Sequence, residues 1–119
     1  MESKHSLLKS FRFAFEGLEV AFLKGRNFRI QVFIGFLAVV LGTILKLSMS
    51  EWLDLVLVIS LVLILELVNT VIETIIDIVN PDISERVKIA KDVAAATVLL
   101  ASVGSVIIGA LLFIPKLFR

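Results

Sequence analysis

Five polar residues follow one helix face through the largely apolar segment 52–79. They are Glu66, Asn69, Thr70, Glu73 and Asp77. At about 100° per residue, their spacing places all five within a sector of roughly 100°. A carboxylate inside a membrane-spanning helix costs at least ~2–3 kcal/mol, so it indicates a partner or a water-filled cavity. The pattern therefore predicts a functional site rather than an ordinary lipid-facing helix.

The carboxylates of this stripe suit two different tasks. Oxygen ligands at a membrane rim suit Mg²⁺, which takes one or two carboxylates and completes its shell with water and substrate phosphates. A second carboxylate one or two turns deeper suits a general base. If Trp52 lies at one interface, Glu66 is roughly 21 Å and Glu73 roughly 31 Å further along the helix, near the opposite boundary. Two interpretations without a ligand stay open. Glu73 and Asp77 could simply be solvated, and Glu66 could be a structural residue that forms hydrogen bonds between helices.

Charged residues follow the stripe after a turn at 80–82. Lys88, Lys91 and Asp92 lie where the next helix begins, and we expect them to close over the same rim. Lysine can bind phosphate as a point charge, but these lysines could equally anchor the helix at the membrane. The nucleotide motifs of soluble proteins, G-x-x-x-x-G-K-[ST] and G-x-G-x-x-G, do not occur. Any phosphoryl transfer here would use an unrelated scaffold.

Composition indicates which elements must position these residues. The 119 residues are 59% hydrophobic and 19% charged, with a mean hydropathy of +1.05. A composition this rich in apolar residues and this poor in charge is typical of lipid-embedded proteins and not of soluble domains. It also argues against nucleic-acid binding. Without cysteine, thiolate zinc sites and cysteine nucleophiles are excluded. We expect one all-α membrane domain over 1–119, with an amphipathic surface helix at about 5–24 and spans at about 29–47, 52–79 and 85–115.

Two further patterns concern assembly and orientation. Small residues at Ala101, Ser105 and Gly109 allow close helix approach and favour a bundle or oligomer. Basic residues concentrate before the first span and between the second and third spans. The positive-inside rule then places the N-terminus and the loop at 80–92 in the cytoplasm and the C-terminus outside.

Two blocks of the sequence resemble the signatures of the prokaryotic diacylglycerol kinase family, which includes undecaprenol kinases. The first is E-x-x-N-x-x-I-E over 66–73, with Asp77 one turn later, and the second contains A-K-D at 90–92. Segments 11–18 and 26–30 look like the N-terminal block of that family. The resemblance implies a homotrimeric lipid kinase of the bacterial inner membrane that transfers the γ-phosphoryl group of MgATP to a lipid hydroxyl at the cytoplasmic interface.

The resemblance also implies roles for individual residues. Glu66 would be the catalytic base and Glu73 the magnesium ligand. The implied ATP-binding residues are Phe13, Glu73, Asp82, Ser84, Lys91 and Asp92, and the implied lipid-binding residues are Ser10, Asn27, Gln31, Glu66, Asn69 and Ala95. One position departs from the family pattern, because Gly25 stands where a second metal-binding glutamate is common. Either one ion is held by Glu73 with more water, or the enzyme is impaired.

Other functions remain to be separated from the lipid kinase. A small oligomeric transporter or proton pathway would use Glu66 and Glu73 as intramembrane carriers and would work without ATP. A transport function does not explain the amphipathic N-terminal helix or the A-K-D segment. A purely structural membrane subunit leaves the acidic stripe unexplained. The sequence does not fix the lipid alcohol, with a slight preference for undecaprenol over diacylglycerol from the form of the second block.

Overall fold

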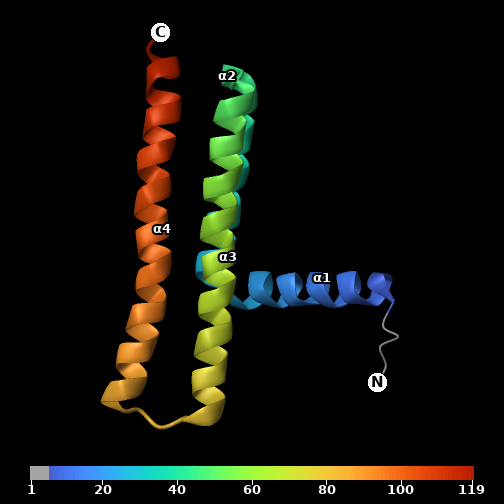
Figure 1. The fold of residues 1–119 in the computed structure, drawn as a ribbon, viewed down its shortest axis with the longest axis vertical. Helices are drawn as coiled ribbons and strands as arrows, with labels where there is room; N and C mark the ends of the chain where they lie inside the picture. Colours follow the sequence, from blue (N-terminus) through green and yellow to red (C-terminus); the bar gives the residue numbers. More distant parts are fainter. Residues whose placement is uncertain (1–5) are drawn as a thin grey trace.

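The computed structural model describes residues 6–119, which form four α-helices. These are α1 (Leu7–Lys24), α2 (Arg26–Leu45), α3 (Met49–Val79) and α4 (Glu85–Leu117). The helices α2, α3 and α4 stand side by side, whereas α1 runs crosswise to them (Figure 1). Residues 6–119 contain no strand, so the all-α prediction is confirmed for them. The expected start of the surface helix at His5 lies outside the described residues.

Serine side chains begin three of the helices. The hydroxyl groups of Ser6, Ser48 and Ser84 each accept a hydrogen bond from the backbone N–H three residues later. At Ser48 this is a reciprocal capping box, because a Glu51 carboxylate oxygen accepts from the Ser48 N–H at 2.8 Å. The cap explains why α3 begins at Met49, three residues before the apolar run suggested.

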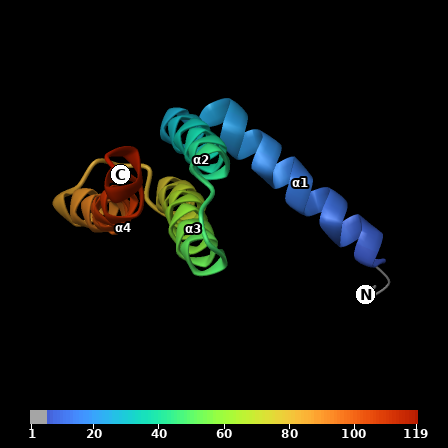
Figure 2. The ribbon, with the colours of Figure 1, turned by 90° about the horizontal axis from the view of Figure 1, so that it is seen from above.

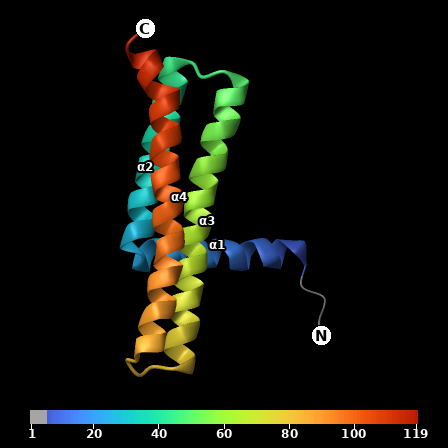
Figure 3. The same ribbon diagram turned by 60° about the vertical axis from the view of Figure 1, so that its left-hand side comes forward.

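Three of the helices are long and apolar enough to cross a membrane, namely α2, α3 and α4. A 31-residue helix such as α3 is about 46 Å long, whereas the hydrocarbon core is about 30 Å thick. One or both ends of α3 must therefore reach beyond the apolar layer. We call the two ends of the bundle the Trp52 end, where α2 joins α3, and the Pro81 end, where α3 joins α4 (Figure 3).

The buried apolar core lies towards the Trp52 end. Leu47, Leu55 and Leu112 are buried together there, with the Trp52 and Phe113 side chains packed around them. Helix α3 packs most extensively on α4 and then on α2. Tight apolar packing is thus found in the half of the bundle at the Trp52 end. Most of the polar stripe lies in the other half, towards the Pro81 end.

Glycines let α2 approach α3 closely. A Cβ atom added at Gly35 would lie 3.1 Å from Cγ2 of Ile59, and one at Gly42 would lie 3.0 Å from Cη2 of Trp52, both on α3. Both glycines are buried on α2. Their lack of a side chain therefore sets the separation of α2 from α3, as small residues do at other membrane helix interfaces.

We expect the Gly35→Leu variant to be destabilised by about 1–3 kcal/mol, because the added side chain overpacks the contact with Ile59. Unfolding by a denaturing detergent in mixed micelles measures this change. Gly17→Leu is the matched control, since a Cβ atom at Gly17 would meet nothing within 4 Å. Equal stability of the two variants would show that the α2–α3 contact is not tight at Gly35.

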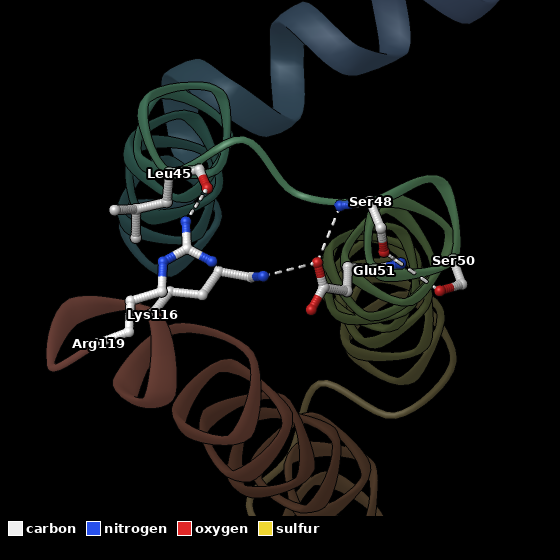
Figure 4. A network of polar contacts seen from close by, with 6 residues as sticks. All are labelled: Leu45, Ser48, Ser50, Glu51, Lys116 and Arg119. Atoms are coloured by element: carbon white, nitrogen blue, oxygen red, sulfur yellow. Dashed lines mark hydrogen bonds and ion pairs between the residues drawn. The ribbon is translucent and has the colours of Figure 1, made fainter.

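A polar network ties the end of α4 to the connection between α2 and α3 (Figure 4). The Lys116 ammonium lies 3.0 Å from Oε1 of Glu51, the same atom that accepts from the Ser48 N–H. Nη2 of Arg119 donates to the Leu45 carbonyl at 3.3 Å. These contacts fix the register of the helices at the Trp52 end, away from the acidic stripe.

Candidate functional site

A polar pocket of about 300 Å³ opens between the start of α2 and the polar stripe of α3. It is lined by Gly25, Arg26, Asn27, Phe28, Glu66, Asn69, Thr70 and Glu73. Four members of the predicted stripe therefore face one pocket, together with the segment that precedes the first span. Helix α3 stays regular through the stripe, which is why the three- and four-residue spacing brings these side chains to one place.

Glu66 is the deepest charged group of this pocket. It is 6% exposed, and within residues 6–119 it is the one charged residue that is buried. Within those residues its carboxylate takes part in no hydrogen bond or ion pair, so it does not join two helices of the same chain. A buried carboxylate without such a partner fits a group that acts on a ligand, and it does not support the structural interpretation within one chain.

Asn69, one turn from Glu66, carries an unused acceptor. Its Oδ1 atom is buried and has no hydrogen-bond partner within the described part of the chain. Leaving a buried acceptor unpaired costs about 1–3 kcal/mol, so such an atom indicates a missing donor or cation. Thr70 does not supply it, because its hydroxyl donates to the Glu66 carbonyl at 3.0 Å. A ligand that brings a hydroxyl group or a cation would satisfy Asn69.

The oxygen atoms of this pocket suit a magnesium ion bound together with phosphates. Glu73 is half-buried at the pocket, and Glu66 and the unpaired Oδ1 of Asn69 line it too. Residues 6–119 contain no cluster of three or more His, Asp or Glu side chains that would enclose an ion completely. This donor set fits Mg²⁺, which needs only one or two carboxylates when water and substrate phosphates complete its shell.

A second pocket, of about 220 Å³, lies at the Pro81 end. Four of the residues predicted to bind ATP line it, namely Asp82, Ser84, Lys91 and Asp92, together with Asp77, the loop at 80–83 and Lys88. The Lys91 ammonium lies 2.7 Å from Oδ1 of Asp77, and the Lys88 ammonium lies 2.7 Å from Oδ2 of Asp92. Asp77 thus belongs to this second pocket. Its side chain is 62% exposed, so the interpretation of a solvated carboxylate fits Asp77 better than it fits the half-buried Glu73.

Lys88, Lys91 and Asp92 therefore do not close over the pocket of Glu66 and Glu73 within one chain. The sequence predicts that Lys88, Lys91 and Asp92 close over the rim of the stripe. The structure brings Lys91 to Asp77, the last residue of the stripe, but it places these residues in a pocket separate from that of Glu66 and Glu73. The reason is the length of α3, which continues to Val79 before the Asn80-Pro81 turn reverses the chain. The ion pair between Asp77 and Lys91 then occupies the space between α3 and α4.

The remaining predicted residues lie elsewhere. The Gln31 amide Nε2 donates to the Ser102 hydroxyl at 3.3 Å, and Gln31 lines a largely apolar pocket of about 330 Å³ between α2, α3 and α4. Ala95 is exposed on α4. Ser10 and Phe13 are exposed on α1, where the Arg12 guanidinium lies 5.7 Å from the centre of the Phe13 ring. Helix α1 leads away from α4 (Figure 2), so one chain does not gather all the residues that the family resemblance implies.

Some residues of the first pocket were not predicted as site residues. Arg26 and Phe28 line it beside the predicted Asn27. Gly25 lies at the pocket, but a Cβ atom there would come within 2.7 Å of the Ala21 carbonyl oxygen. A glutamate at this position would require the backbone between α1 and α2 to shift. The backbone between α1 and α2 therefore has room for glycine only at position 25. In the sequence this requirement was visible only as a departure from the family pattern.

Comparison with known proteins gives consistent matches over nearly the whole chain. A family model described as prokaryotic diacylglycerol kinase matches residues 12–113. The chain is 43% identical over 113 residues to a diacylglycerol kinase of Synechocystis, which covers 94% of this chain and 65% of that relative. It is 37% identical over 109 residues to the undecaprenol kinase of Bacillus subtilis, covering 92% and 89%. A diacylglycerol kinase of Escherichia coli K12 is 30% identical over 101 residues, covering 85% and 83%. The chain thus spans about two thirds of the Synechocystis relative and most of the other two.

Proposed function

Because this chain belongs to the prokaryotic diacylglycerol kinase family, we propose that it is a bacterial membrane lipid kinase that phosphorylates a lipid alcohol with ATP. The observation that carries the proposal is the buried, unpartnered carboxylate of Glu66 beside the half-buried Glu73 in one polar pocket. Phosphoryl transfer depends mainly on alignment and charge neutralisation rather than on covalent chemistry by the protein. A small pocket of oxygen ligands at the edge of an apolar bundle supports both.

The proposed reaction assigns separate tasks to two glutamates. Glu66 accepts the proton of the lipid hydroxyl as the hydroxyl oxygen forms its bond to the γ-phosphorus atom and the bond to the ADP oxygen breaks. Glu73, about two turns or 10 Å along α3, would hold Mg²⁺, which supplies neutralisation of phosphate charge when bound. Asn69 would accept a hydrogen bond from the lipid head through its unpaired Oδ1. Gly25 adds no carboxylate, so we propose one ion held by Glu73 and water.

The second pocket is the proposed site for the rest of the nucleotide. Ser84 and Lys91 offer a hydroxyl group and a positive charge there, and Asp82 and Asp92 offer acceptors. We propose that the Pro81 end and the N-terminus face the cytoplasm, where ATP is available, and that the C-terminus is outside. Ser10, Phe13 and Ala95 complete the sites in this proposal only when copies of the chain associate as a homotrimer.

We expect the Lys91→Met variant to raise the KM for ATP by roughly tenfold, about the effect of one lost charge-assisted contact. The KM for the lipid should stay within twofold of its wild-type value, since Lys91 lines the second pocket and not the first. Steady-state kinetics with each substrate varied in turn measures both values. Arg86→Met is the matched control, because it removes a positive charge from the same helix start outside that pocket. An unchanged KM for ATP in Lys91→Met would remove Lys91 from the nucleotide site.

The lipid alcohol is decided by direct competition. Purified protein in mixed micelles would receive MgATP with equal mole fractions of diacylglycerol and undecaprenol, and both phosphorylated products would be quantified. We expect one product to dominate, and undecaprenyl phosphate is the product we favour. Dominant phosphorylation of diacylglycerol would correct the substrate while leaving the lipid kinase proposal in place. Failure to phosphorylate either lipid would contradict it.

A further inference from the structure

Helix α1 is held to the rest of the chain by a short elbow at Gly25. The Gly25 N–H donates to the Ala21 carbonyl at 2.8 Å, and the Arg29 N–H donates to the Gly25 carbonyl at 3.1 Å. Ala21 and Phe28 are buried on the two sides of the elbow. Beyond it, α1 projects as an arm with its large apolar side chains exposed (Figure 2). Its direction must therefore be set near the elbow.

Arg29 spans this elbow with two hydrogen bonds. Its Nη1 atom donates to the Phe22 carbonyl at 2.8 Å and to the Leu23 carbonyl at 3.0 Å. Both carbonyls belong to the last turn of α1, where backbone acceptors have no partner within the helix. A guanidinium placed there is also attracted by the negative end of the helix dipole. Because Arg29 is itself part of α2, the two bonds join the helices rigidly.

From this geometry we propose that Arg29 is the positioning residue that fixes α1, and with it Ser10 and Phe13, relative to the bundle. This inference rests on the proposed lipid kinase function for its catalytic consequence. Arg29 acts through α1 and is not assigned a contact with either substrate. If only a fraction of molecules holds α1 in place, apparent substrate affinity falls by that fraction, whereas turnover at saturation is preserved.

The direction of α1 can be measured without any activity. The chain contains no cysteine, so Leu8→Cys on α1 and Ile44→Cys on α2, both exposed positions, accept two spin labels cleanly. Dilution with unlabelled protein restricts electron–electron distance measurements to pairs within one chain. We expect a narrow distance distribution in the otherwise wild-type protein and a broadened or shifted one in Arg29→Gln. Arg29→Lys, which keeps the positive charge but replaces the planar guanidinium with a compact ammonium group, should lie between them.

Lys24→Gln is the matched control for charge. Lys24 is the basic residue in the last turn of α1 itself and, among the described hydrogen bonds, its side chain makes none to the Phe22 and Leu23 carbonyls. Its variant should keep the narrow distribution. A distribution in Arg29→Gln as narrow as that in Lys24→Gln, centred at the same distance, would overturn the proposal.

Kinetics tests the catalytic consequence separately. We expect Arg29→Gln to raise the KM for the lipid roughly tenfold, equivalent to about 1.4 kcal/mol, with kcat within twofold of wild type and partial rescue in Arg29→Lys. A large fall in kcat with unchanged KM would contradict a positioning role. If the wild-type protein phosphorylates no lipid, the proposed function fails, but the distance measurement still decides whether Arg29 fixes α1.

Discussion

The Glu66→Gln variant should lose phosphate transfer to the lipid by a factor of roughly 10²–10⁴, the usual contribution of a positioned general base. Glutamine has nearly the same shape as glutamate, so the buried site keeps its packing while it loses the group that accepts the proton. Nucleotide binding should be unchanged, because Glu66 does not line the second pocket. The measurement is phosphorylated lipid formed per protein at saturating MgATP, with nucleotide affinity determined by calorimetry.

Asp54→Asn is the control for removing a carboxylate from α3. Asp54 is exposed towards the Trp52 end and lines neither polar pocket. It should transfer phosphate at the wild-type rate. Turnover retained in Glu66→Gln would remove the base assignment and would favour the interpretation of Glu66 as a structural hydrogen-bonding residue.

The Glu73→Gln variant should also lose transfer, but for a different reason. Amide oxygen is a weaker ligand for a hard cation than carboxylate, so the variant should need much more Mg²⁺ and should show little turnover at ordinary concentrations. We expect a loss of at least roughly a hundredfold, in the range seen when phosphate charge loses its stabilising partners. The dependence of rate on free Mg²⁺ at fixed ATP measures it.

Excess metal separates the two glutamates. Raising Mg²⁺ should recover part of the activity of Glu73→Gln and none of the activity of Glu66→Gln. Binding of Mn²⁺ in the presence of a non-hydrolysable ATP analogue gives a second readout, which should weaken in Glu73→Gln alone. Equal metal dependence in Glu73→Gln and the wild type would remove Glu73 as the ligand.

The acidic pocket could be anticipated because the helical period is local. Glu66, Asn69 and Glu73 face one direction in any regular helix, and nothing interrupts α3 between them. The start of α3 was also readable, since the S-x-x-E pattern at 48–51 is a capping box, although hydropathy alone placed the span later.

Contacts between distant segments could not be anticipated in the same way. The ion pair of Asp77 with Lys91 depends on how far α3 runs before the turn and how α4 packs against it. That packing divides the predicted residues between two pockets. The bonds from Arg29 to α1 likewise depend on a change of chain direction at Gly25, for which hydrophobic periodicity gives no angle.

We expect the pocket around Glu66 and Glu73 to transfer phosphate to a membrane alcohol. Wild-type protein and Glu66→Gln would each be reconstituted in vesicles that contain both candidate lipids, ATP labelled at the γ position would be added with Mg²⁺, and the label in extracted lipid would be counted. A lipid kinase with Glu66 as its base gives labelled lipid with the wild type and none above background with Glu66→Gln. Absence of labelled lipid with both proteins, alongside an ATP-independent proton or solute flux that requires Glu66, would contradict it and favour a transport function.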